Sequence, residues 1–246
     1  MAGLRLGFVA VVAASLLGAG PVVAERLLVL TATAGYRHES IPATAAAIEG
    51  LARPLGLVVE RRDGPVPLPR LPLEGVVAVV LAQTTGDFLG NEAAAALESF
   101  VRGGGGLLAV HAAADAHYGW PAFEELVGAW FRAHPPGLQT TLVRFAPDLP
   151  GLEALGGGRE WWVTDELYDF RSNPRGRVQV IATIDERTYE GGGMGADHPI
   201  AWCHKVGRGR SWYTGLGHRA ELFADPVMRE HLSRGLAWVI GRARTC

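Results

Sequence analysis

The sequence predicts an α/β fold, with a mainly parallel sheet, helices on both of its faces and a hairpin near the C-terminus. Of four short runs in the first half, three are almost wholly apolar and the second begins with three apolar residues; such runs are typical of strands covered on both faces. Segments with helical spacing separate the first run from the second and the third from the fourth. The chain has 246 residues and is 48% hydrophobic, enough for one large core.

The strands that we expect in the first half cover residues 26–32, 57–63, 76–84 and 107–111. Apolar residues at helical spacing indicate a helix over 41–56, with Pro42 in its first turn and Gly56 at its end. A second helix is expected over 91–106, with Asn91 as its N-cap and glycines at its C-terminal end.

The second half is less regular, and its elements are mixed. We expect a helix over 120–131, strands or strand–loop units over 138–146, 160–170 and 178–185, and a hairpin over 200–218. A terminal helix over 225–241 would be capped by Asp225 and have Pro226 in its first position. Residues 25–246 are therefore expected to form one domain.

The first 24 residues have the layout of a secretory signal peptide. Arg5 is their only charge, an apolar run follows it, and small residues precede Glu25, so we expect cleavage after Ala24. An uncleaved anchor helix is the alternative, but the run is short for a hydrocarbon core of about 30 Å. The expected location is the periplasm or the medium. No Cys lies near the cleavage site, which argues against a lipoprotein.

The charge and the cysteines restrict the partners. A formal net charge of −2 gives no reason to expect nucleic acid or an anionic membrane surface as a partner. Cys203 and Cys246 could pair in an oxidising compartment. Because Cys246 is the last residue, we expect instead a buried Cys203 in a strand and an incidental terminal thiol. Neither cysteine has metal-ligand spacing.

Histidines follow several of the expected strands. Ligands of parallel α/β sheets bind at the carboxyl ends of the strands. His38 follows the first strand and His111 ends the fourth, while His117, His134 and His218 lie in later loops. Each one alone could be a surface or structurally hydrogen-bonded residue. As a set, they are expected to converge on one crevice.

His111 is the sharpest candidate, because a neutral imidazole at a tight turn after a strand can act as base, acid or metal ligand. A helix cap or a contact to a phosphate-like anion, without catalysis, is the alternative. A third hypothesis groups His38, His111, His134 or His218 around a divalent metal ion. No H-x-x-x-H or H-E-x-x-H pair is present. We therefore assign no cofactor and leave a divalent metal open.

The segment "WWVTDELYDF" contributes Asp165, Glu166 and Tyr168. If it is a strand, Glu166 and Tyr168 share one face and Asp165 lies on the other. Burial among aromatic residues would raise the pKa of one of these acids and suit it to proton transfer. An ordinary solvated acid in a loop is the alternative.

Aromatic residues and one arginine are candidates for substrate contact. A sugar ring could stack on Trp120, Trp161, Trp162 or Tyr168, although Trp more often lies in a core. Arg210, after the glycine turn of the hairpin, could bind an anion or a group of hydroxyls; the alternative is an ordinary hairpin charge.

Several common catalytic motifs are absent from the sequence. It has no G-x-S-x-G elbow, no Walker-type loop and no G-x-G-x-x-G fingerprint. The run "GGGG" at 103–106 precedes a strand rather than a helix, so it is a poor phosphate cradle. No Cys stands near "LLAVH", which excludes a Cys–His pair of the glutamine amidotransferase type.

Five segments together resemble the ThuA-like (trehalose utilisation) family: "GYRHES", "GGGGLLAVHAAAD", "GAWFRAHPP", "TDELYDF" and "PIAWCHKVGRGRSWYTGLGH". The resemblance runs from about residue 26 to 241. It implies a three-layer, flavodoxin-like fold of the class I glutamine amidotransferase type without the catalytic Cys, and places His111 at or near the nucleophile turn. The histidines and acids of the family's motifs fall on His38, His111, His134, Asp165, Glu166 and His218.

One departure from the family pattern is visible. Members carry a "DHP" segment before the Asp–Glu motif, whereas this chain has "APDLPGLEALGGG" at 146–158. "DHP" occurs later, at 197–199, in a different context. The role of the earlier segment therefore does not carry over.

The resemblance implies a protein of trehalose or related disaccharide utilisation that acts on 3-keto glycosides by acid–base cleavage or isomerisation, and not a glutamine amidotransferase. The expected catalytic residues are His111, Asp165 and Glu166. The expected substrate-binding residues are His38, Trp120, His134, Tyr168, Arg210 and His218. A non-catalytic sugar-binding or accessory protein is the alternative. The expected partner is a small carbohydrate, and homo-oligomer formation is left open.

Overall fold

A nine-stranded sheet organises the computed structural model, which describes Gly3 and residues 24–246. Its strand order is β2-β1-β3-β4-β11-β10-β9-β6-β7, and β5 and β8 form a separate pair. The strands are β1 (Arg26–Leu30), β2 (Val58–Arg62), β3 (Val76–Ala82), β4 (Gly106–Val110), β5 (Phe131–Ala133), β6 (Gln139–Phe145), β7 (Glu160–Asp165), β8 (Asp169–Phe170), β9 (Gln179–Ile184), β10 (Pro199–Val206) and β11 (Gly209–Thr214).

The first half of the sheet is parallel, as the apolar runs predict. Strands β2, β1, β3, β4 and β11 pair in parallel in that order. All of β4 and nearly all of β1 and β3 are buried, because helices cover both faces of these central strands. The carboxyl ends of β1, β3, β4 and β11 therefore lie along one edge of the sheet.

The expected hairpin occupies the centre of the sheet rather than its border. Its strands β10 and β11 are antiparallel, and β11 pairs in parallel with β4, with Thr214 opposite Val110. Beyond β10 the pairing is antiparallel through β9, β6 and β7. This register brings the segment after β11 beside the segment after β4.

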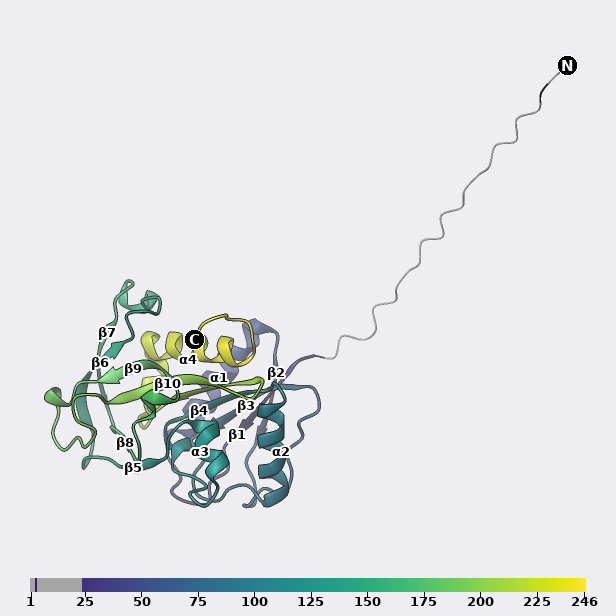
Figure 1. Ribbon diagram of the computed structural model, residues 1–246, viewed down its shortest axis with the longest axis horizontal. Coiled ribbons are helices and arrows are strands. Elements are labelled where there is room, and N and C mark those ends of the chain that lie inside the picture. The colour runs from purple at the N-terminus through teal and green to yellow at the C-terminus, as the bar shows by residue number, and fades with distance from the viewer. Residues whose placement is uncertain (1–2, 4–23) are drawn as a thin grey trace.

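Helices lie on both faces of the sheet: α1 and α4 on one face and α2 and α3 on the other (Figure 1). Their bounds are α1 (Ile41–Ala52), α2 (Asn91–Arg102), α3 (Pro121–Val127) and α4 (Pro226–Val239). The predicted α/β class is confirmed. Asp225 caps α4 through Val227 N–H at 2.7 Å, whereas Gly90, not Asn91, is the N-cap of α2.

The predicted helix over 120–131 ends early, at Val127. Gly128 has a φ of +104°, which an L side chain rarely adopts, and a Cβ there would lie 2.3 Å from Nε1 of Trp202. Trp202 Nε1–H donates to the carbonyl of Val127 at 2.8 Å and so satisfies the end of the helix. The chain is then free to form β5, which pairs with β8.

The expectation of an incidental terminal thiol is wrong, because Cys203 and Cys246 form a disulfide. After α4 the chain turns back, and Arg210 donates to the carbonyl of Ala243 at 2.8 Å. The returning tail places Cys246 against β10, where both sulfur atoms are buried. The bond is consistent with an oxidising compartment.

The predicted signal peptide lies outside the described residues, except for Gly3 and Ala24. Among the helices that the structure describes, none combines the length and apolar character needed to cross a membrane.

Candidate active site

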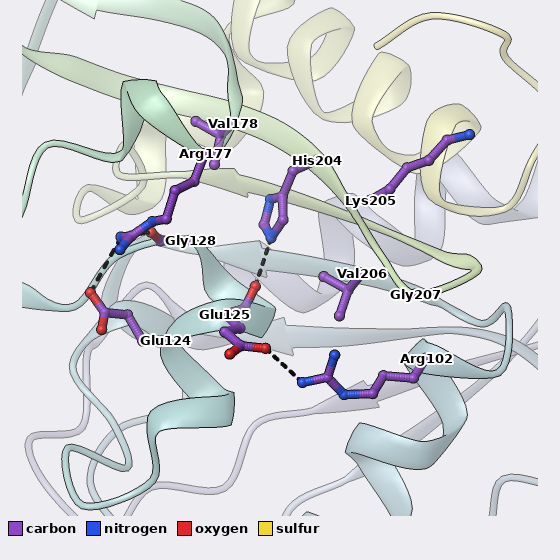
Figure 2. Close-up of a pocket in the computed structure, with 10 residues that line it drawn as sticks. All are labelled: Arg102, Glu124, Glu125, Gly128, Arg177, Val178, His204, Lys205, Val206 and Gly207. Carbon is purple, nitrogen blue, oxygen red and sulfur yellow. Dashed lines mark hydrogen bonds and ion pairs between the residues drawn. The ribbon is translucent and has the colours of Figure 1, made fainter.

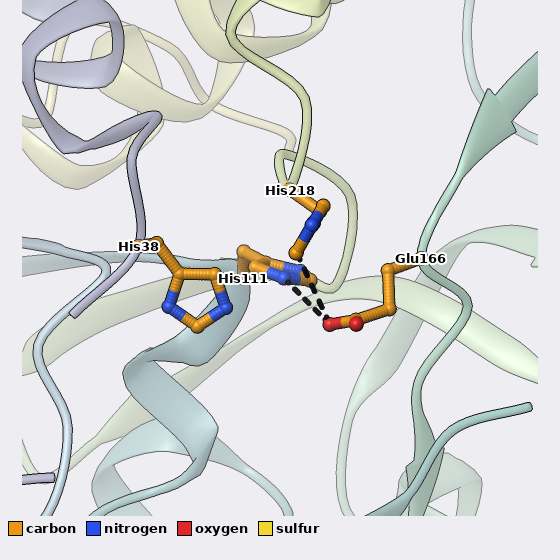
Figure 3. Close-up of side chains that lie close together, drawn as sticks. All are labelled: His38, His111, Glu166 and His218. Atoms are coloured by element: carbon orange, nitrogen blue, oxygen red, sulfur yellow. Dashed lines mark ion pairs between the residues drawn. The ribbon is translucent and has the colours of Figure 1, made fainter. Parts of the chain in front are cut away.

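Four side chains from distant parts of the chain meet at the carboxyl edge of the sheet: His38, His111, Glu166 and His218 (Figure 3). Glu166 Oε2 lies 3.2 Å from Nδ1 of His218 and 3.5 Å from Nε2 of His111. The ring of His38 lies 5.0 Å from that of His111 and 5.2 Å from that of His218, between centroids. One potential ligand atom from each residue lies within 4.8 Å of the other three.

The four side chains lie close together because each one comes from a segment next to the end of a strand. His38 lies between β1 and α1, His111 directly follows β4, Glu166 directly follows β7, and His218 follows β11. His111 has a φ of +48°, so the chain turns sharply as it leaves β4. Its carbonyl accepts a hydrogen bond from the buried Tyr213 hydroxyl at 2.9 Å, which holds this turn in place. The predicted tight turn at His111 is therefore present.

His134 and Tyr168 complete the surroundings of the cluster. Nε2 of His134 lies 3.3 Å from Oε1 of Glu166, and the Tyr168 ring stacks on the His111 ring at 4.1 Å. The β5–β8 pair places both residues, since His134 follows β5 and Tyr168 precedes β8. The side chain of His134 is 36% exposed and marks the open side of the cluster.

Several buried nitrogens of this cluster lie near one another and near Glu166 without a hydrogen bond of good geometry. Nδ1 of His111 lies 2.7 Å from the Gly215 carbonyl and donates to it, so Nε2 is the ring nitrogen that faces Glu166. Buried His38 Nδ1, His111 Nε2 and His218 Nδ1 have no hydrogen-bond partner. Buried nitrogens without a partner beside a carboxylate are costly unless a proton or a metal ion lies between them.

A divalent cation fits this donor set. Three imidazole nitrogens and one carboxylate oxygen are ordinary zinc ligands, and at bond lengths of about 2.1 Å tetrahedral ligands lie about 3.4 Å apart. The separations here, up to 4.8 Å, need only small side-chain rotations to reach that geometry. Protons on the imidazoles are the alternative source of positive charge.

The titration of the cluster follows from these contacts. Burial, together with the smaller effect of charge on His111 and His218, lowers the pKa of His38 to about 3. Burial acts to raise the pKa of Glu166, but its contacts with His111 and His218 outweigh burial and hold the pKa well below its usual range. Its contact with Glu166 raises the pKa of His218. Glu166 is therefore ionised at neutral pH.

Asp165 lies beside the cluster but points elsewhere. It is the last residue of β7, and its carboxylate accepts backbone N–H bonds from Gly217 at 2.6 Å and Arg219 at 3.1 Å. These bonds fix the loop that carries His218. Burial raises the pKa of Asp165, although the amides favour its ionised form. Glu166 and Tyr168 follow β7 and are not part of it. The alternation of side chains along a strand, on which we based their expected shared face, therefore does not apply to them.

Gln83 is a structural participant that the sequence did not single out. It follows β3 with a φ of +59°, is fully buried, and joins two of the loops of the site. Its amide donates to Gly217 O at 3.1 Å and to Thr44 Oγ1 at 2.5 Å, and its carbonyl accepts from Ser40 Oγ at 3.0 Å. Its position, a polar residue directly after an apolar strand, was the feature of the sequence that could have identified Gln83 as part of the site.

Two expected substrate-binding residues lie elsewhere. Arg210 is near the start of β11, at the opposite end of the strand from His218, and its guanidinium lies over the Trp238 ring at 4.5 Å. Trp120 packs on Phe123 at 5.6 Å and on His117 at 5.5 Å. The structure does not bring either of them to the cluster.

A second group of potential ligands, Asp169, Glu186 and His198, is already saturated by protein donors. His198 lies 2.8 Å from Glu186 and 2.9 Å from the Tyr168 carbonyl, and Glu186 also accepts N–H bonds from Met194 and Gly195. The later "DHP" segment thus anchors the chain beside Tyr168.

The cavity shown in Figure 2 lies at the other end of the sheet, near the β10–β11 turn. Four of its charged side chains form ion pairs, Arg102 with Glu125 at 2.6 Å and Arg177 with Glu124 at 3.4 Å, and Lys205 points away from them (Figure 2). His204 donates to the Glu125 carbonyl at 2.7 Å. This cavity has one imidazole, and so it does not gather several imidazoles around a carboxylate as the cluster does.

Comparison with known protein families shows to which family this chain is related. The trehalose utilisation (ThuA) family matches residues 26–239, nearly all of the described chain. The chain belongs to the ThuA family. The family supports a role in carbohydrate utilisation. No curated protein matches the sequence.

Solved structures show that the ThuA fold is shared. A ThuA-like protein from Bacteroides uniformis is similar with a TM-score of 0.69 and 20% identity, over 89% of this chain and 93% of that one. A ThuA-like protein from Parabacteroides merdae gives 0.68 and 19%, over 91% and 93%. A β-galactosidase from Bacillus circulans gives 0.52 and 13%, over 86% of this chain and 31% of that one. At these identities the likeness concerns the fold alone.

Proposed function

We propose that this protein is an enzyme of carbohydrate utilisation that cleaves a 3-keto glycoside by acid–base elimination. The observation that carries the proposal is one ionised carboxylate, Glu166, within 3.5 Å of the imidazoles of His111, His134 and His218. Membership of the ThuA family supports the carbohydrate part of the proposal.

The chemistry requires proton transfer but no nucleophile. A ketone at C3 of a sugar acidifies the C2–H bond, and a base removes that proton to leave an enolate. When the C3 carbonyl re-forms, the electron pair makes a C1–C2 double bond and the C1–O bond breaks. An acid protonates the departing oxygen. The products are an unsaturated 3-keto sugar and the released alcohol, so no co-reactant is consumed.

The roles follow from the geometry. His111 and Glu166 are the proton-transfer pair, since the Nδ1 proton of His111 faces Gly215 O and Nε2 is left facing the carboxylate. His38 and His218 line the same point and hold substrate hydroxyls; if a divalent cation binds there instead, His111 and Glu166 would be among its ligands as well. A bound cation would supply the positive charge that stabilises an enolate oxygen. Asp165 positions His218 through the Gly217 and Arg219 amides.

Purified protein and 3-keto-trehalose test this proposal, with products followed by chromatography. Glu166→Gln keeps the size of the side chain and removes its charge, so we expect turnover to fall by about 10²-fold or more. His204→Gln, at the distant cavity, is the matched control and should stay within about twofold. Unchanged turnover in Glu166→Gln overturns the proposal. Tight binding of unmodified disaccharides without any product favours the sugar-binding alternative.

Metal analysis separates the two sources of positive charge. Protein purified without chelator should carry about one equivalent of a divalent metal if the cation is present, and His38→Gln should lower that content. Metal-free protein with full turnover assigns His38 and His218 to substrate hydroxyls instead.

A further inference from the structure

The aromatic ring of Tyr36 is exposed to solvent at the edge of the candidate site. Tyr36 is 65% exposed, although its ring lies edge-on to that of His38 at 4.8 Å. The other large hydrophobic side chains that are strongly exposed among the described residues are Val58, Leu138 and Trp162. Tyr36 is the one in this group that contacts a member of the cluster.

The backbone beneath this ring is held firmly. Thr85 accepts the Ala34 N–H at 2.8 Å through its carbonyl and donates its hydroxyl to the Tyr36 carbonyl at 2.8 Å. Arg37 donates to the Thr31 carbonyl at 2.9 Å. A rigid backbone that leaves a large ring unpacked is preorganised for a ligand, since little conformational entropy remains to be lost on binding.

The charged side chains around the candidate site disfavour an anionic ligand. The arginines near the cluster histidines in sequence are each paired with a carboxylate: Arg37 with Asp63 at 2.6 Å, Arg132 with Asp169 at 3.0 Å and Arg219 with Glu221 at 3.5 Å. The Glu39 carboxylate lies close enough to His218 to act on it electrostatically. A phosphate group would meet carboxylates here rather than a free guanidinium.

We propose that Tyr36 is the platform on which one sugar ring of an uncharged glycoside lies. This inference rests on the proposed function and names its substrate class. The C–H face of a pyranose is apolar and packs on an aromatic ring, while its hydroxyls remain free for imidazoles and carboxylates. A sugar seated on Tyr36 lies beside His38 and presents its oxidised ring to His111 and Glu166.

Three variants test the platform on 3-keto-trehalose. Tyr36→Ala removes the ring and should raise KM about tenfold while kcat changes by less than about twofold. Tyr36→Phe keeps the ring and should restore KM to within about twofold. Val58→Ala is the control, because Val58 is 51% exposed at the start of the edge strand β2, at the end of the sheet opposite the cluster. It should leave both constants unchanged.

The outcomes separate this inference from the proposed function. If Tyr36→Ala has the KM of the wild type while Glu166→Gln abolishes turnover, the platform is refuted and the proposed function stands. If the wild type turns over no keto glycoside, calorimetry with trehalose still tests the platform: about tenfold weaker binding in Tyr36→Ala supports it, and equal affinity refutes it. Trehalose 6-phosphate should bind at least about tenfold more weakly than trehalose, and equal or tighter binding refutes the uncharged class.

Discussion

A buried histidine on α4 should make the protein acid-sensitive. His231 is 2% exposed, lies between the rings of Trp212 and Phe145, and has no partner for Nε2. Burial lowers its pKa from 6.5 to about 3, with a smaller contribution from Arg234. The unfolded chain therefore binds a proton at this residue before the folded chain does. The resulting stability is fully present above pH 6.5 and is lost as the pH falls toward 3.

The magnitude follows from this difference in pKa. At about 1.4 kcal/mol per pKa unit, the loss between pH 7.5 and pH 5.0 is about 2 kcal/mol. His231→Leu removes the titrating group. Urea unfolding at the two pH values should then show the free energy of unfolding of the wild type falling by about 2 kcal/mol more than that of the variant.

A packing control distinguishes protonation from a lost contact. Leu236→Ala truncates another buried side chain of α4 and should lower the stability by about 2–5 kcal/mol, by the same amount at both pH values. If wild type and His231→Leu instead lose stability in parallel as the pH falls, the assignment of acid sensitivity to His231 is refuted.

Three further predictions concern the disulfide and the supports of the site. Cys246→Ser should lower the free energy of unfolding by about 4 kcal/mol, because the bond closes a separation of 43 residues, and a thiol reductant should destabilise the wild type but not the variant. Gln83→Leu should cost about 2–3 kcal/mol in urea unfolding through its lost buried hydrogen bonds. Asp165→Asn turns an amide group toward a backbone N–H of Gly217 or Arg219, and should reduce both stability and turnover of 3-keto-trehalose.

Local chemistry explains why the elements of the first half were predictable. Apolar runs identified β1, β3 and β4. The left-handed Gly56 ends the 3-10 turn that follows α1, and the capping Asp225 begins α4 where expected. Each of these features depends on residues within a few positions of one another. The positions of His38, His111 and His218 after strands followed in turn, since parallel strands end at a common edge.

Long-range pairing explains what could not be predicted. The disulfide depends on how the tail returns to β10, and Arg210 lies at the far end of β11 because of the direction of that strand. Gln83 acts through Ser40 and Gly217, which are 177 residues apart. No local pattern encodes such a separation.

The sequence by itself therefore determined the class of fold, the ends of its central strands and the imidazoles found there, because backbone propensity, capping and hydrophobic burial act over short distances. The tertiary structure alone decided that, of the two neighbouring acids, Glu166 lies among those imidazoles and Asp165 binds a loop, and that Tyr36 is exposed beside them. Those outcomes depend on sheet register and loop packing, which only the folded chain establishes.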